Sequence, residues 1–413
     1  MKKLLQINPV LRVSTSTGRI MQEIGELAIA NGWKSYIAYS YARDGIKPCK
    51  SELVPVGGKT GILGHWLATR LFDRHGLASE QDTKDFIRVM DEINPDIVHI
   101  HNIHGYFLNY KILFDYLARK NKPVVWTVHD CWLYTGHCYY YTSAGCSKWK
   151  IHCGRCPQKK KFPASYLFDR SFKNFEDKRK AFTSIQASNM YVVPVSEWIM
   201  GEMSDSFLKN ANFTLIHNGI DTNVFNIYSG EEIKKKYGID GKRIILGVAS
   251  IWSREKGLND FLELSKIIGP DEVIVLVGVD DRTKSRLPGN IIGIRRTENV
   301  QALAELYSAA DVFVNPTWQD NYPTVNLESI ACGTPVVAYN VGGATEAITE
   351  ETGCAVRAGD IAGLYKAVKE IEAKGKAFYA PRCRNFAEVN FRKEDRYADY
   401  IRLYEEIISR SVM

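Results

Sequence analysis

The chain has 413 residues, of which 45% are apolar and 24% charged, and its formal net charge is +7. This composition is that of an ordinary soluble globular protein and excludes a disordered chain, and the length predicts two or three domains. The modest positive charge permits anionic ligands or an anionic membrane surface, but it does not indicate a nucleic acid as the partner.

The start of the chain has no signal peptide pattern, because Met1-Lys2-Lys3 leads into only a short apolar run. No apolar run approaches the ~20 residues that span a bilayer. We therefore expect a cytoplasmic protein, in which the nine cysteines are reduced rather than paired in disulfides.

The first elements alternate between strand and helix. Residues 4–8 predict a buried strand, residues 14–18 a turn, residues 19–31 an amphipathic helix and residues 36–39 the next strand. This order is a Rossmann-like opening. Gly18 ends the turn and would let the backbone approach a ligand closely.

Residues 59–74 predict a basic amphipathic helix. Its apolar residues recur at helical spacing and its charges are basic: Leu63, Trp66, Leu67 and Leu71, with Lys59, Arg70 and Arg74. One interpretation is adsorption to anionic lipid, where a polyprenol-linked acceptor would be found. The other is a helix packed on the sheet, which we favour.

Polar side chains follow two predicted strands, which are residues 96–100 and 123–128. Ligands bind at the carboxyl ends of parallel strands, so the side chains that follow should gather at the edge of a ligand cleft. They are His101, Asn102, His104 and His129. A single histidine is usually structural, but several at successive strand ends indicate a site.

Residues 131–161 form a cysteine-rich insert that ends in three lysines. Cys153 and Cys156 have the C-x2-C spacing of a zinc knuckle, and Cys138 and Cys146 are candidate partners. In a reducing compartment, four thiolates predict a tetrahedral structural zinc site. The alternatives are reduced core cysteines, or a site in which His137 or His152 is a ligand.

A second alternating segment begins after the Asn-Gly turn at 218–219, with a strand over residues 244–249 and a helix over residues 258–268. Arg254 and Lys256 lie in the loop between them. Two cations just before a helix start are suited to binding a diphosphate.

Two acids stand eight residues apart near the end of this segment, Asp320 and Glu328, with a helix start between them. Pro323 suits the first helical position, because its missing N–H costs nothing there. The first amides of the helix, at Thr324 and Val325, would then attract a phosphate. This arrangement suits a nucleotide-sugar, with Asp320 on the sugar and Glu328 on the ribose hydroxyls.

This pattern resembles the E-x7-E motif of the retaining family 4 glycosyltransferases, which have the GT-B fold, although Asp320 stands in place of the first glutamate. The resemblance implies an α/β protein with two Rossmann-like domains facing across a cleft. It places an acceptor domain at residues 1–195, a nucleotide-sugar domain at 213–390, and a last helix at 391–413 that crosses back to the first domain.

The resemblance also implies roles for single residues. His129 would contact the donor sugar by accepting or donating a hydrogen bond, and the loop at Gly18 would close over the donor. The family usually has an arginine where Ser250 stands, so Arg254 would compensate beside Lys256. The implied catalytic residues are His129, Lys256 and Asp320, and the implied donor-binding residues are Gly18, Arg254, Lys256, Asn321, Tyr322, Pro323, Thr324, Val325 and Glu328.

The predicted reaction is transfer of a sugar from a nucleotide-diphosphate sugar to a glycan or polyprenol-linked hydroxyl, with retention and without a metal in the transfer step. Cysteine-rich inserts occur in a subset of bacterial polysaccharide glycosyltransferases, which implies surface polysaccharide assembly and a peripheral contact with the inner membrane. A sugar-nucleotide epimerase of the same fold and a zinc-containing carbohydrate-binding protein are the alternatives. A nicotinamide dehydrogenase is disfavoured, because no G-x-G-x-x-G follows the first strand.

Overall fold

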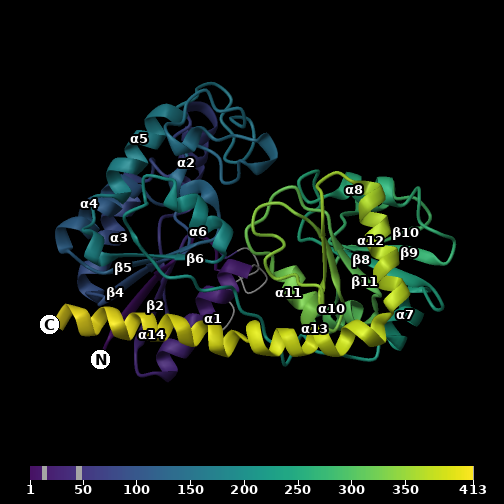
Figure 1. Cartoon of the computed structure of the whole chain (residues 1–413). Coiled ribbons are helices and arrows are strands. Elements are labelled where there is room, and N and C mark those ends of the chain that lie inside the picture. Colours follow the sequence, from purple (N-terminus) through teal and green to yellow (C-terminus); the bar gives the residue numbers. More distant parts are fainter. Residues whose placement is uncertain (12–15, 43–48, 413) are drawn as a thin grey trace. The chain divides into compact units, whose positions relative to one another are not determined.

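A computed structural model describes residues 1–11, 16–42 and 49–412 of the chain. The chain divides into two compact units, each an α/β unit with one parallel sheet (Figure 1). Unit 1 contains residues 1–217 and 396–413, and unit 2 contains residues 218–395.

The sheet of unit 1 has seven strands in the order β3-β2-β1-β4-β5-β6-β7, and all neighbours are parallel. The strands are β1 (Lys3–Ile7), β2 (Lys34–Tyr39), β3 (Glu52–Pro55), β4 (Ile97–Ile100), β5 (Val124–Val128), β6 (Met190–Pro194) and β7 (Asn212–Phe213). The helices are α1 (Ser16–Ala30), α2 (Lys59–Phe72), α3 (Glu80–Ile93), α4 (Tyr110–Lys120), α5 (Ser171–Phe182), α6 (Glu197–Ser204) and most of α14 (Lys393–Val412).

The sheet of unit 2 has six parallel strands in the order β10-β9-β8-β11-β12-β13. The strands are β8 (Arg243–Val248), β9 (Glu272–Val277), β10 (Ile291–Ile294), β11 (Val312–Asn315), β12 (Val336–Tyr339) and β13 (Gly353–Val356). The helices are α7 (Glu231–Tyr237), α8 (Leu258–Leu264), α9 (Asp281–Lys284), α10 (Val300–Ala309), α11 (Thr324–Ala331), α12 (Ile361–Lys374) and α13 (Lys376–Asn390).

Alternating strand residues build two separate cores on the two faces of the first sheet. Leu5 and Val98 join the core that contains residues of α3 and α4, whereas Leu4 and Ile97 join the core that contains residues of α1 and α14. This follows from the two-residue period of a strand, because both faces of a parallel sheet are covered by helices.

The strand order reverses at one point in each sheet, between β1 and β4 in unit 1 and between β8 and β11 in unit 2. In open α/β sheets, ligands bind at the carboxyl ends of the strands at such a switch point. Each unit therefore has one place where a site is expected.

The basic helix predicted at 59–74 differs from our expectation. The helix exists as α2, but Leu63, Trp66 and Leu67 are exposed, and the residues it buries are His65 and Thr69. The prediction that its apolar residues pack on the sheet is therefore wrong. Among the described helices, none is both long enough and apolar enough to cross a bilayer.

Candidate functional site

The switch point of unit 2 brings together two of the residues predicted from the sequence. Lys256 follows β8, Asp320 follows β11, and the Lys256 Nζ lies 2.7 Å from the Asp320 Oδ2. The carboxylate is mostly covered and the ammonium is partly exposed. A cation and an acid are thus fixed next to each other at the carboxyl edge of the sheet.

The loop that holds Lys256 is tied to the loop that holds Asp320. The Glu255 carbonyl accepts hydrogen bonds from the Trp318 amide at 2.8 Å and from the Thr317 hydroxyl at 3.2 Å. Between them, Gly257 has a φ of +80°, and a Cβ there would clash with the carbonyl oxygen of Pro316. A glycine is therefore required where the two loops meet.

The helix predicted between the two acids is α11, but it begins one residue later than expected. Thr324 is the first helical residue, and Pro323 is the N-cap rather than the first helical position. The amides in the first turn of a helix have no acceptor within the helix, so those of Thr324 and Val325 remain the candidate anion donors.

Two buried asparagines fix the start of α11. The Asn315 Nδ2 donates to the Asn326 Oδ1 at 2.8 Å, and the Asn326 Nδ2 donates to the Ala344 carbonyl at 2.8 Å. This chain links the end of β11, the first turn of α11 and the glycine-rich turn after β12. The amide-bearing end of the helix is therefore held by side chains that are themselves hydrogen-bonded.

Asn218 is a positioning residue that the sequence analysis assigned only to a turn. It is buried, and its Nδ2 donates to the Tyr322 carbonyl at 3.2 Å. The Asn-Gly pair explains the turn itself, but no sequence pattern indicates a partner 104 residues away. Asn218 thus stabilises the loop of Asp320, Asn321 and Tyr322.

The other predicted donor residues lie in the same unit. Glu328 is buried one turn into α11 and accepts a hydrogen bond from the Tyr307 hydroxyl at 3.3 Å. The residue Arg254 is exposed, two positions before Lys256. Asn321 and Tyr322 are buried, and the Asn321 amide donates to the Asp320 Oδ1 at 3.0 Å.

The histidines predicted to gather in unit 1 do so at the ends of β4 and β5. The His101 Nδ1 lies 3.4 Å from the His129 Nε2, and the His104 Nε2 lies 2.6 Å from the Asp130 Oδ2. Asn102, between His101 and His104, is half-buried. His99, inside β4, contacts Thr127 and Tyr404 and is part of the core.

Hydrogen bonds determine which ring nitrogens carry protons. The Gln6 Nε2 donates to the Met21 carbonyl at 2.9 Å, so the Gln6 Oε1 accepts from the His101 Nε2 at 3.0 Å. The neutral His101 ring then has its lone pair on Nδ1 and accepts from the His129 Nε2. The His129 Nδ1 is consequently a hydrogen-bond acceptor.

Burial lowers the pKa of His129 to about 4, although nearby Asp130 opposes the shift, and burial lowers the pKa of His101 well below its ordinary value. Both rings are neutral near pH 7. The prediction that Gly18 ends a turn before the helix is wrong, because α1 begins at Ser16 and Gly18 is buried in its first turn. The first part of the predicted turn at 14–18 lies outside the described residues.

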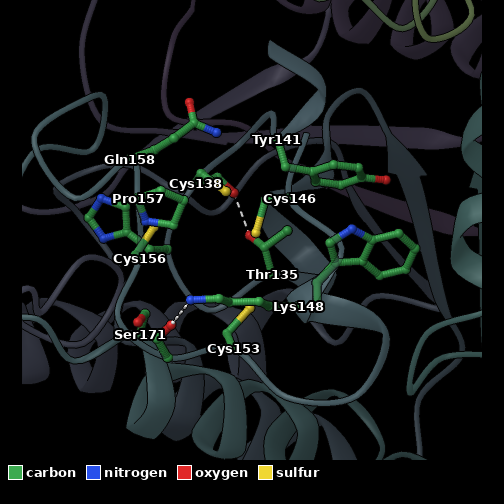
Figure 2. A pocket seen from close by; sticks show the side chains of 13 residues that line it. Thr135, Cys138, Tyr141, Cys146, Lys148, Cys153, Cys156, Pro157, Gln158 and Ser171 are labelled. Atoms are coloured by element: carbon green, nitrogen blue, oxygen red, sulfur yellow. Dashed lines mark hydrogen bonds between the residues drawn. The ribbon is translucent and has the colours of Figure 1, made fainter. Parts of the chain in front are cut away.

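Four cysteines of the insert line one cavity of about 20 Å³, as Figure 2 shows: Cys138, Cys146, Cys153 and Cys156. The Gly136 amide donates to the Cys153 Sγ at 3.2 Å. As arranged, however, no three His, Cys, Asp or Glu side chains in the described ranges could hold a metal ion. The structural zinc stays a prediction.

Metal analysis of the purified chain tests the zinc prediction. Four thiolates that closed on one ion would keep about one zinc per chain through purification, because structural sites bind tightly. A content below about 0.2 zinc per chain would reject the four-cysteine site.

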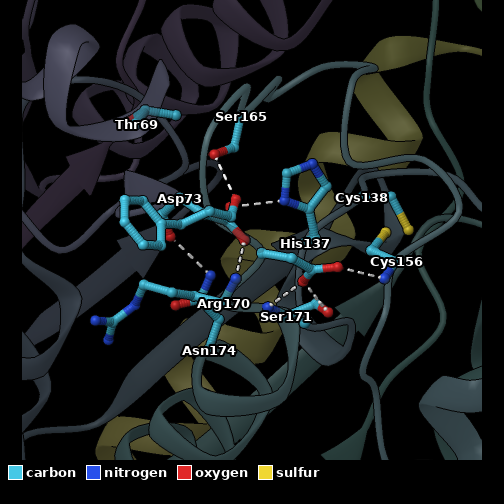
Figure 3. A network of polar contacts seen from close by, with 12 residues as sticks. Thr69, Asp73, His137, Cys138, Cys156, Ser165, Arg170, Ser171 and Asn174 are labelled. Carbon is cyan, nitrogen blue, oxygen red and sulfur yellow. Dashed lines mark hydrogen bonds and ion pairs between the residues drawn. The ribbon is translucent and has the colours of Figure 1, made fainter. Parts of the chain in front are cut away.

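A buried polar network fixes the insert to α2 and α5 (Figure 3). Asp73 ends α2, and its carboxylate contacts the His137 Nδ1 at 2.7 Å and the Arg170 amide at 2.8 Å. Nearby, the buried Lys178 ammonium donates to the carbonyls of Trp132 and Thr135 at 2.6 and 2.9 Å. The insert is therefore a packed part of unit 1.

Comparisons with known proteins agree with this architecture. The family model described as Glycosyltransferase Family 4 matches residues 64–224, and the model described as Glycosyl transferases group 1 matches residues 242–373. The chain belongs to the family 4 glycosyltransferases. The predicted family and the predicted GT-B fold are therefore confirmed.

One relative of this glycosyltransferase is the putative colanic acid biosynthesis glycosyl transferase WcaC of Escherichia coli, which is 23% identical over 89% of this chain and 90% of its own. Among solved structures, sucrose-phosphate synthase from Thermosynechococcus elongatus has a TM-score of 0.75 at 16% identity, covering 99% of this chain and 100% of its own. HepE from Anabaena, solved in complex with UDP-glucose, has a TM-score of 0.68 at 13% identity and covers 99% of this chain and 100% of its own.

Proposed function

We propose that this glycosyltransferase moves a sugar from a nucleotide-diphosphate sugar to an acceptor hydroxyl with retention of configuration. The observation that carries the proposal is the Lys256–Asp320 pair at the switch point of unit 2, beside the first turn of α11. Lys256 and the amides of Thr324 and Val325 supply positive charge for a diphosphate, and Asp320 supplies an acceptor for sugar hydroxyls.

Charge stabilisation of the leaving diphosphate is the main task of the site. In the structure, Asp320 is the counter-ion of Lys256. A bound diphosphate would compete with that carboxylate for the ammonium, while Arg254 adds a second cation. Such donors act on the charge that develops in the transition state, so the transfer step needs no metal in this proposal.

Within unit 1, His129 is the proposed contact to the donor sugar. Its ring is neutral near pH 7, so it would accept a hydrogen bond from a sugar hydroxyl or donate one to it. Gly18 would allow the backbone at the start of α1 to approach the donor. Glu328 is the proposed partner of the ribose hydroxyls, in competition with Tyr307.

Retention is proposed through attack by the acceptor on the face from which the diphosphate departs. Asp320 is the carboxylate proposed to contact the sugar, and its ion pair with Lys256 makes it a poor nucleophile for a double displacement. The similarity to WcaC supports surface polysaccharide assembly as the setting. The acceptor would then be a glycan or a polyprenol-linked sugar on the cytoplasmic side of the membrane.

A panel of UDP-, GDP- and ADP-sugars tests the function by thermal shift, since a ligand that binds only the folded chain raises the unfolding temperature. We expect one nucleotide class to raise it, and to be consumed faster when an acceptor glycan is added. No shift with any donor would contradict the proposal. Conversion of the donor alone to an epimer would support the epimerase instead.

A further inference from the structure

The polar and apolar faces of helix α2 are reversed relative to those of an ordinary surface helix. Its buried face is polar, with His65, Thr69 and Asp73 at four-residue spacing. The His65 Nδ1 lies 3.0 Å from the Ser79 hydroxyl, and its Nε2 accepts from the Gly76 amide at 3.0 Å. These hydrogen bonds satisfy the polar face and fix the rotation of the helix about its axis.

The opposite face of α2 carries exposed apolar side chains. Leu63 is 58% exposed, Leu67 is 43% exposed and Trp66 is 39% exposed. Leu63 and Leu67 share a stripe with Arg70, at positions i, i+4 and i+7. Apolar and basic side chains therefore point the same way, away from the sheet.

A loop next to α2 extends this exposed face. Tyr166, Leu167 and Phe168 are 56%, 64% and 54% exposed. The Tyr166 amide donates to the Arg70 carbonyl at 2.7 Å, and the Phe168 amide donates to the Leu71 carbonyl at 3.2 Å. The ring of Phe168 also stacks on Phe72, with 5.6 Å between the centroids. The loop is thus fixed to the end of the helix.

Basic residues lie among and beside these apolar side chains. The Arg70 guanidinium lies 5.5 Å from the Trp66 ring and 5.7 Å from the Tyr166 ring. Lys59 is exposed at the start of α2, and Arg74 lies 3.8 Å from Glu80. Six apolar and aromatic side chains, defined here as the α2 patch, therefore have cations around them: Leu63, Trp66, Leu67, Tyr166, Leu167 and Phe168.

We propose that the α2 patch inserts into the surface of a bilayer that contains anionic phospholipid. Leucine and aromatic side chains partition into the headgroup and acyl boundary, while arginine and lysine beside them pair with lipid phosphates. The charge complementarity favours an anionic lipid surface over a second copy of this basic chain. The inference does not depend on the reaction, because it rests on residues outside the proposed donor site.

Vesicle sedimentation with the purified full chain tests the proposal. Vesicles of phosphatidylethanolamine with about one third phosphatidylglycerol should retain the chain, and vesicles of phosphatidylcholine should retain much less, since anionic lipid strengthens such binding. The variant Leu63→Ser, Leu67→Ser, Leu167→Ser should weaken binding at least about tenfold, because three apolar insertions are lost. These side chains are exposed, so folding should be kept, which circular dichroism checks.

The matched control is Ile267→Ser, Val389→Ser, which removes exposed apolar residues of unit 2, at 44% and 68% exposure. It should bind vesicles as the unchanged chain does. Equal binding of the patch variant and the unchanged chain would overturn the proposal, as would the absence of binding to anionic vesicles. The proposal would also be overturned if light scattering showed that the unchanged chain is a dimer, that the patch variant is a monomer, and that neither binds vesicles. That result would assign the patch to self-association.

Discussion

At the scale of single residues, the pair of Lys256 and Asp320 is the central feature of this glycosyltransferase. The two side chains come from loops 64 positions apart and meet at 2.7 Å. Asp320 has a shorter side chain than the glutamate that the family motif has at this place, and the ion pair gives this shorter carboxylate a defined position. In the proposed function, this pair is the part of the site that a donor sugar would contact.

Two substitutions at Asp320 distinguish the effect of the carboxylate charge from the effect of the side-chain length. Asp320→Glu should keep the ion pair with Lys256 and reduce turnover by less than about tenfold. Asp320→Asn removes the charge, so Lys256 loses its counter-ion and turnover should fall by about 10²-fold. Steady-state transfer rates with a saturating donor compare the two. Equal activity of the asparagine and glutamate variants would show that the charge is not needed.

At the scale of elements, the alternation of strands and helices was predictable. Apolar residues form short continuous runs in the buried parallel strands and recur with a helical period in most of the helices. The buried strand runs predicted at residues 4–8, 96–100 and 123–128 needed no tertiary information and correspond to β1, β4 and β5. The orientation of α2 was not predictable in this way. Its apolar residues follow a helical period, but its polar face is satisfied by partners that periodicity does not reveal.

The site was predictable to a similar extent. The motif around Asp320 indicated the helix start, and the switch point places Lys256 beside it. The contact of Asn218 with the Tyr322 carbonyl could not be derived, because it joins positions that only the folded chain brings together. The start of α11 lies one residue after the predicted start, because Pro323 has an extended ψ of 117°.

The junction of the two loops in unit 2 depends on Gly257. Gly257→Ala should lower the free energy of unfolding by about 2–4 kcal/mol, because a left-handed φ and a clash with the Pro316 carbonyl add together. Gly238→Ala is the matched control, with a φ of +64° and no atom near its Cβ. It should cost about 1 kcal/mol. Equal melting temperatures of the two variants would contradict a tight junction.

At the scale of the whole molecule, five histidines whose pKa values are lowered make unit 1 sensitive to acid. Burial lowers the pKa of His65 and His129 to about 4, that of His99 to about 3, and those of His75 and His101 well below the ordinary value. In the unfolded chain these five histidines become protonated near pH 6.5, whereas in the folded chain they become protonated only at lower pH.

The free energy of unfolding should therefore be highest above pH 6.5 and should fall as the pH decreases toward about 4. Each histidine contributes at most about 1.4 kcal/mol per pH unit in this range. Thermal unfolding at constant ionic strength measures how steeply the unfolding midpoint changes with pH. His99→Gln removes one titrating ring and should give a shallower slope, and a midpoint that is constant between pH 6.5 and 4.5 would contradict this account.

The central claim is that the carboxyl edge of the second sheet binds a nucleotide diphosphate through Lys256 and the first turn of α11. Calorimetric titration of the nucleoside diphosphate identified by the donor panel tests it most directly. Lys256→Ala should weaken binding by about 10²-fold, whereas Lys266→Ala, an exposed lysine paired with Glu263, should bind as the unchanged chain does. Equal affinity of the Lys256→Ala variant and the unchanged chain would contradict the claim.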